Sequence, residues 1–258
     1  MNSRAGRQIA SEAPVRCAGF SRLPNGAALA ILLGSRLKPV LRTGALLLLL
    51  ATAASAQLPW QQDFEDRLPG QVPAGWSLAW GNGGDDLLLT SNLRAASGQR
   101  SLLLDRQSGE QSPMGGYSTR YANLADGWLH FQFQLLLWGK ADAVRFGFEW
   151  RGANPGDRVA VIGVDGRKVT FTSGDFAKSA PLGEVGEDQW ATLQLWLPTT
   201  GGAQTEAVAR LGDGPAVHLP AKPPASGHGT FMLVTYPGKR GYMAFLDSLS
   251  VTRADTAP

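Results

Sequence analysis

The stretch that decides the fold is Trp-Leu-His-Phe-Gln-Phe-Gln-Leu-Leu-Leu-Trp-Gly-Lys-Ala-Asp-Ala-Val-Arg-Phe-Gly-Phe-Glu-Trp-Arg, residues 128–151. On both sides of a break at Gly139–Ala143, apolar residues recur at every second position, which is typical of β-strands with one face in a core. We expect the two strands to pair as a hairpin whose register places all apolar side chains on one side. The expected pairs are Leu137 with Val144, Leu135 with Phe146, Phe133 with Phe148 and Phe131 with Trp150.

The other side of this hairpin is polar and aromatic. It carries Trp128, His130, Gln132, Gln134 and Trp138, followed by Arg145, Gly147, Glu149 and Arg151. The run 189–197 repeats the pattern, with Trp190, Thr192, Gln194 and Trp196 on one side.

Tryptophan rings can stack on the apolar faces of sugars, while Gln, His and Arg hydrogen-bond to the hydroxyl groups. We therefore interpret both sets as candidate residues of a carbohydrate-binding platform, with Gly147 leaving room at its centre. In the alternative interpretation the tryptophans lie beneath loops or pack against a second sheet. A protein-binding face is a further alternative, because exposed Trp and Arg also favour protein interfaces.

The N-terminal segment has the layout of a secretory signal peptide. Arg36, Lys38 and Arg42 precede the apolar run 44–53, which ends in Ala54-Ser55-Ala56, so we expect cleavage before Gln57. The apolar run is roughly ten residues, well short of the ~20 that span a membrane. Residues 1–35 are then an extended leader or a start assigned too early. This predicts export to the periplasm, the cell surface or the medium.

Removing residues 1–56 changes the charge balance of the chain. The leader holds seven of the 24 basic residues and one of the 21 acidic ones, which leaves 17 basic against 20 acidic. The remaining chain has no basic patch of the kind that nucleic-acid-binding proteins need. The single cysteine, Cys17, also lies in the leader, so residues 57–258 fold without a disulfide.

Residues 57–258 read as one all-β domain, because short alternating runs are separated by Gly, Pro, Asn and Asp throughout. The pattern predicts an antiparallel jelly-roll β-sandwich. We expect strands at 60–65, 76–80, 87–90, 101–105, 117–124, 159–164, 167–172, 189–197, 207–211, 216–219, 230–236 and 242–252. Asp165-Gly166 predicts a two-residue hairpin turn between two of them.

Short motifs at the two ends of this region resemble the concanavalin A-like lectin/glucanase superfamily, including its laminin-G-like members. They are Asp63-Phe64-Glu65, Gly75-Trp76, Ser97-Gly98-Gln99-Arg100-Ser101-Leu102, residues 164–169, residues 189–193 and Phe245-Leu246-Asp247-Ser248-Leu249-Ser250-Val251. The resemblance implies a jelly-roll sandwich of a kind that often binds carbohydrate. It does not by itself imply an activity.

Asp247 alternates with apolar residues of the last strand, so we expect its carboxylate on the core face with a partner. The partner is an arginine, backbone amides of a neighbouring strand, or a metal ion. Many modules of the family that the motifs resemble hold a structural Ca²⁺ between their first and last strands, and Asp63 and Glu65 are then the further candidate ligands.

Catalytic motifs are not found in the sequence. The Glu-x-Asp-x-x-Glu strand of the related glucanases is missing, and we interpret Glu149 as a partner of Gln132 or of a neighbouring arginine. The histidines 130, 218 and 228 lack zinc-site spacing, and there is no Gly-x-Ser-x-Gly motif. The sequence thus predicts a secreted, non-catalytic, lectin-like module whose partner is a glycan. The alternatives are a structural or protein-binding module of the cell envelope and, less favoured, a divergent glycoside hydrolase.

Overall fold

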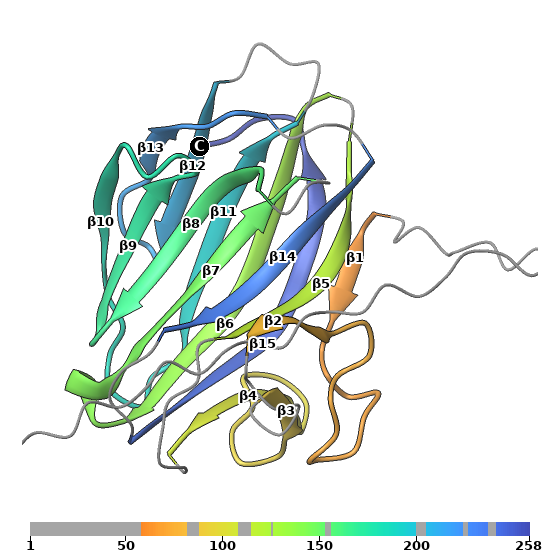
Figure 1. The fold of residues 1–258 in the computed structure, drawn as a ribbon, viewed down its shortest axis with the longest axis vertical. Coiled ribbons are helices and arrows are strands. Elements are labelled where there is room, and N and C mark those ends of the chain that lie inside the picture. The colour runs from red at the N-terminus through yellow and green to blue at the C-terminus, as the bar shows by residue number, and fades with distance from the viewer. Residues whose placement is uncertain are drawn as a thin grey trace, which may run out of the picture. The chain divides into compact units, whose positions relative to one another are not determined.

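The computed structural model describes residues 58–81, 88–107, 115–124, 126–152, 156–199, 205–223, 227–236 and 241–258. These residues form two antiparallel β-sheets that pack face to face, as Figure 1 shows, which confirms the predicted all-β sandwich. In the described part of the chain no helix is long and apolar enough to cross a membrane. The expected leader and its cleavage site lie outside the described residues.

Sheet A joins strands from both ends of the described chain. Its order is β13 (Val217–Pro220), β12 (Glu206–Leu211), β11 (Ala191–Pro198), β6 (Trp128–Gly139), β15 (Tyr242–Ala254), β4 (Ser101–Arg106) and β3 (Leu88–Ser91). The short strand β1 (Trp60–Gln62) also pairs with β15. The first and last strands of the described fold are therefore neighbours.

Sheet B contains the remaining strands. Its order is β10 (Ser179–Glu184), β9 (Lys168–Ser173), β8 (Arg158–Asp165), β7 (Arg145–Arg151), β14 (Gly227–Thr235), β5 (Gly115–Asn123) and β2 (Ser77–Gly81). In Figure 1, β7, β8 and β14 lie in front of β6 and β11 of sheet A. A single 3₁₀ turn, Ala141–Ala143, carries the chain from β6 in one sheet to β7 in the other.

The predicted hairpin between β6 and β7 is therefore wrong. β6 pairs with β11 and β15, whereas β7 pairs with β8 and β14. The alternation was interpreted correctly, because both strands bury the predicted apolar face. The apolar faces of β6 and β7 lie opposite each other across the interior, because in this arrangement each face shields the other from water.

The residues that were expected to pair do contact one another through the core. The rings of Phe133 and Phe148 have centroids 4.9 Å apart, and those of Phe131 and Trp150 are 5.7 Å apart. All four side chains are fully buried. Burying a side chain of this size stabilises a fold by about 1.5–3 kcal/mol, so this aromatic layer is a principal contact between the sheets.

The predicted strands agree with the observed ones to within three residues at each end. The Asp165-Gly166 hairpin joins β8 to β9, although the two turn residues are Gly166 and Arg167, because Asp165 pairs with Lys168. Strand β10 was not predicted. It lies at the edge of sheet B and contains Pro181 and Gly183, which obscure its period, and prolines are tolerated at sheet edges.

Strand β15 changes the face it presents within its own length. Its register with β6 shifts between Asp247 and Ser250, and Ser248 has a φ of +52°. Before the shift Phe245 and Asp247 point to the outer face of sheet A, and after it Leu249 and Val251 point to the core. The expectation that Asp247 shares the core face is thus wrong, because a β-bulge interrupts the alternation.

Candidate binding site

The predicted platform is divided between the two outer faces of the sandwich. Sheet A carries the predicted residues of β6 and β11 and, directly before β11, Trp190. We call this set the glutamine face: Trp128, His130, Gln132, Gln134, Trp138, Trp190, Thr192, Gln194 and Trp196. Sheet B carries the predicted residues of β7, Arg145, Gly147, Glu149 and Arg151. A single surface cannot contain both sets, because their strands lie in different sheets.

On the glutamine face the two predicted strands are direct neighbours. Gln132 lies opposite Gln194, and Gln134 lies opposite Thr192. Gln134 Nε2 donates a hydrogen bond to Thr192 Oγ1 at 3.0 Å. The structure thus brings together two strands that the sequence singled out separately, and it places a row of half-buried amides and hydroxyls at their centre.

Trp196 does not offer its ring to solvent. Its exposed fraction is 8%, its ring stacks on His130 at 4.4 Å with planes 8° apart, and the Arg210 guanidinium lies 5.7 Å from the ring centroid. Burial lowers the pKa of His130, and a hydrogen bond with Gln194 opposes this shift. The Trp196 ring is therefore covered by His130 and Arg210 and is not available to stack on a sugar.

The remaining tryptophans of this face differ in exposure. Trp190 packs against an outer apolar cluster of Leu103, Leu136 and Phe245, and it is half-buried. Trp128 is also half-buried, whereas Trp138 keeps 37% of its surface exposed. The interpretation of the tryptophans as covered residues thus holds for Trp196 and in part for Trp190. Trp138 remains available for contact.

A pocket of about 490 Å³ adjoins this face where β11 begins. Its walls are the end of β10, the segment 186–190, the start of β11 and the β12–β13 turn at 212–214. The lining residues are Leu182, Gly183, Glu184, Gly186, Gln189, Trp190, Ala191, Thr192, Gln194, Leu211, Gly212, Asp213 and Gly214. Three residues of the predicted platform, Trp190, Thr192 and Gln194, thus take part.

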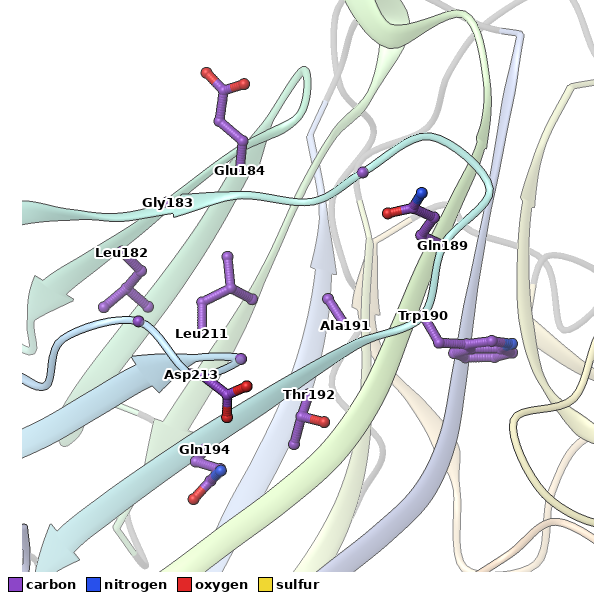
Figure 2. Close-up of a pocket in the computed structure, with 13 residues that line it drawn as sticks. Leu182, Gly183, Glu184, Gln189, Trp190, Ala191, Thr192, Gln194, Leu211 and Asp213 are labelled. Atoms are coloured by element: carbon purple, nitrogen blue, oxygen red, sulfur yellow. The ribbon is translucent and has the colours of Figure 1, made fainter.

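The pocket is lined by polar groups and by two leucines of the core, Leu182 and Leu211. Figure 2 shows Leu182 beside Leu211, and the Asp213 carboxylate directed from its turn toward Gln194 and Thr192. Gly212 has a φ of +55°, the conformation that lets the chain reverse here and place Asp213 at the rim. Carboxylate, amide and hydroxyl groups on a partly apolar surface are a common arrangement for binding a polar small molecule.

Asp213, Gln189 and Glu184 were not predicted as site residues. Asp213 lies in a Gly-Asp-Gly turn that is indistinguishable from any solvent-exposed turn in the sequence. Glu184 belongs to β10, the strand that was not predicted. The pocket lining contains several glycines, and these turn-forming residues were the feature of the sequence that could have indicated a pocket here.

The proposed calcium ligands do not fit a cation. Asp247 is fully buried, and its carboxylate accepts the backbone N–H groups of Ala96, Ser97 and Ser248 at 2.6–2.9 Å. Glu65 Oε1 accepts those of Gln99 and Arg100, both at 2.7 Å. Asp63 accepts the Glu65 N–H at 3.1 Å.

Backbone N–H donors favour an anion and repel a cation, so Asp247 and Glu65 are satisfied without a metal ion, and Asp63 is exposed. Within the described ranges no three His, Cys, Asp or Glu side chains gather to form a metal site. Burial raises the pKa of Asp247, and the hydrogen bonds to it oppose the shift. Of the three predicted partners, backbone amides are the kind observed, although they come from the β3–β4 loop and from Ser248 and not from a neighbouring strand.

These contacts also connect three of the motifs on which the resemblance rests. The segment 96–100 is held between Glu65 of the first motif and Asp247 of the last. Gly98 has a φ of +62°, and a Cβ there would lie 2.5 Å from Glu65 Oε1. Three motifs far apart in the sequence therefore form one structural clasp around the β3–β4 loop.

No family model matches this sequence, and the search of curated proteins gives no match. Solved structures do resemble the fold. An endo-β-1,4-glucuronan lyase from Trichoderma reesei superposes with a TM-score of 0.53 and 11% identity, over 76% of this chain and 95% of that chain. A PL-14 alginate lyase from Aplysia kurodai gives 0.53 and 8%, over 76% and 98%.

A sialidase gives a TM-score of 0.54 and 11% identity, over 78% of this chain and 19% of that chain. At these identities the likeness shows the fold alone. The neighbours are β-sandwich proteins whose names denote activity on carbohydrates, which is consistent with the concanavalin A-like architecture that the motifs resemble.

Proposed function

We propose that this protein is an exported, non-catalytic carbohydrate-binding module that holds a neutral glycan in the pocket beside the glutamine face. The observation that carries the proposal is that Asp213, Gln194 and Thr192 line one pocket at the end of the glutamine face (Figure 2). The fold neighbours, two lyases and a sialidase by name, support a carbohydrate ligand.

The polar groups of the pocket match the chemistry of sugar hydroxyls. The Asp213 carboxylate accepts hydrogen bonds, the Gln194 amide donates and accepts, and the Thr192 hydroxyl can donate because Gln134 donates to its oxygen. Leu182 and Leu211 also line the pocket, but they belong to the core and keep only 6% and 8% of their surfaces exposed, so polar groups dominate its contacts. The volume lies within the roughly 300–1,000 Å³ of typical small-molecule sites.

The carboxylates of the pocket support binding and not hydrolysis. A glycosidase places two carboxyl groups on either side of the bond that it cleaves. Figure 2 shows Glu184 directed away from Asp213, so the two do not enclose a common point. The proposal therefore assigns Asp213 the role of a hydrogen-bond acceptor.

The test is a screen of neutral oligosaccharides on a glycan array, followed by titration calorimetry with wild type, Asp213→Asn and Gln194→Ala. A hydrogen bond to a charged group contributes about 1.5–3 kcal/mol, so Asp213→Asn should weaken binding about tenfold or more at an unchanged melting temperature. Asp255→Asn, which removes an exposed carboxylate outside the pocket, is the matched control. Full affinity in both pocket variants would refute the site.

The same oligosaccharides should be recovered intact after long incubation with the protein. Chromatography of the incubated glycans checks this directly. Release of shorter products by wild type, and not by Asp213→Asn, would refute the non-catalytic part of the proposal and favour hydrolysis or elimination at this pocket.

A further inference from the structure

The outer face of sheet B contains a row of glycines that crosses the strands. Gly163 of β8 pairs with Gly147 of β7, Gly147 pairs with Val234 of β14, and Val234 pairs with Gly116 of β5. Directly paired residues point to the same face, so the neighbouring Gly163 and Gly147 leave a depression where side chains would otherwise stand, and the Val234 side chain separates it from Gly116.

Aromatic side chains border the depression, and one end of it is open. A Cβ at Gly147 would lie 3.1 Å from the Tyr236 hydroxyl, so the Tyr236 side chain extends over this glycine. Trp80 and Met232 cover Gly116 in the same way. A Cβ at Gly163, in contrast, would meet nothing within 4 Å. The row thus forms a trough that is filled from the β2 side as far as Tyr236 and open beyond it.

An ordered group of charges lies next to the trough. Glu149 is 4% exposed and accepts hydrogen bonds from Arg151 Nε at 2.8 Å and Arg158 Nε at 2.9 Å. Arg158 also lies 5.2 Å over the Phe176 ring, and 34% of its side chain stays exposed. The Glu149 carboxylate and the Phe176 ring therefore hold the Arg158 guanidinium in place, while part of it stays exposed to solvent.

The charges around Tyr236 are mainly positive. Of the charged groups that act on Tyr236, Glu149 is negative, whereas Arg158 and Arg145 are positive. Burial first, and then Glu149, raise the pKa of Tyr236, while Arg158 and Arg145 oppose this shift. The phenol therefore stays protonated at neutral pH and can donate a hydrogen bond. The paired Asp165 and Lys168 at the end of these strands cancel each other in charge.

We infer that this face is a second site, for a sugar that carries a carboxylate. A guanidinium binds a carboxylate with strong, charge-assisted hydrogen bonds, and a protonated phenol adds a neutral donor. The glycine trough admits a flat ring between Tyr236 and the open end at Gly163. Such a site differs from the pocket of the glutamine face in both position and charge, so the two can be tested independently.

The test uses galacturonic acid oligomers and the same oligomers with methyl-esterified carboxyl groups. Calorimetric titration of the full chain should show binding of the acid form and at least tenfold weaker binding of the ester. Arg158→Gln should weaken binding of the acid form at least tenfold, with Lys222→Gln as the control for the loss of an exposed charge. Equal affinity for the two oligomers, or no binding of either, would overturn the site.

Gly163→Ile tests the trough without disturbing the ion pairs. The backbone of Gly163 has an ordinary φ and open space above it, so the variant should fold with an unchanged or higher melting temperature. It should also lose binding of the acid oligomer at least tenfold. Unchanged binding in this variant would overturn the trough. So would equally tight binding of a sulfated oligosaccharide of the same length, which indicates attraction by charge density alone.

The outcome separates this site from the proposed function. Asp213 lies in the β12–β13 turn of sheet A, so the Asp213→Asn variant should bind the acid oligomer as wild type does. Loss of that binding in Asp213→Asn would place the acidic sugar in the first pocket and overturn the second site.

Discussion

Phe133 on β6 and Phe148 on β7 meet across the interior of the sandwich, with ring centroids 4.9 Å apart and ring planes at 63°. The two strands follow each other in the chain, yet each ring reaches the other from the opposite sheet. This contact connects the two halves of the stretch 128–151. It also directs their polar faces to opposite sides of the molecule, which separates the two sites.

The first prediction concerns this layer. Phe148→Ala should lower the free energy of unfolding by about 3–5 kcal/mol, because it removes a large, fully buried ring and leaves a cavity. Leu68→Ala, at a side chain that is 62% exposed, should change it by less than about 1 kcal/mol. Urea denaturation measures both. A loss in Phe148→Ala no greater than in the control would contradict the two-sheet core.

Asp247 gives the second prediction. Asp247→Ala leaves three backbone N–H groups without their acceptor, and each buried unsatisfied group costs about 1–3 kcal/mol. We expect Asp247→Ala to lower the free energy of unfolding by roughly 2–5 kcal/mol. Wild type should have the same melting temperature in excess calcium and in chelator, because the Asp247 and Glu65 carboxylates already accept hydrogen bonds from backbone N–H groups. A calcium-dependent rise that Asp247→Ala abolishes would contradict the clasp.

The pH dependence of stability gives the third prediction. Burial lowers the pKa of His130 in the folded state, whereas the unfolded chain keeps about 6.5. The unfolded state therefore binds more protons in the window below that value, and stability should fall as pH decreases from 7 toward 5. His130→Gln should reduce this slope, and His228→Gln, at an exposed position, should not. Identical slopes in wild type and His130→Gln would refute the effect.

Local structure was largely predictable from the sequence, because alternation reports which side of a strand is buried. Phe131 and Phe148 were placed correctly in the core for this reason. Alternation does not reveal which strand lies beside which, so β6 and β7 were assigned to one sheet. Alternation also fails at a bulge. Ser248 adopts a positive φ, which the sequence pattern does not predict, and Asp247 therefore points outward.

The candidate sites were predictable only in part. β6 and β11 were both singled out, and their adjacency brings Gln132 beside Gln194. Asp213 lies on a turn, and turns carry no periodicity that distinguishes a ligand-binding carboxylate from a solvated one. The glycine row in sheet B depends on the register of four strands, so Gly147 alone could indicate space but not its extent.

The measurement that tests the central claim most directly is the response of backbone amide NMR signals to a neutral oligosaccharide selected on the array. We expect the shifts to concentrate at Thr192, Gln194 and residues 212–214, and we expect Asp213→Asn to remove them. Shifts confined to other parts of the chain, or none with any neutral oligosaccharide, would contradict the proposed binding site.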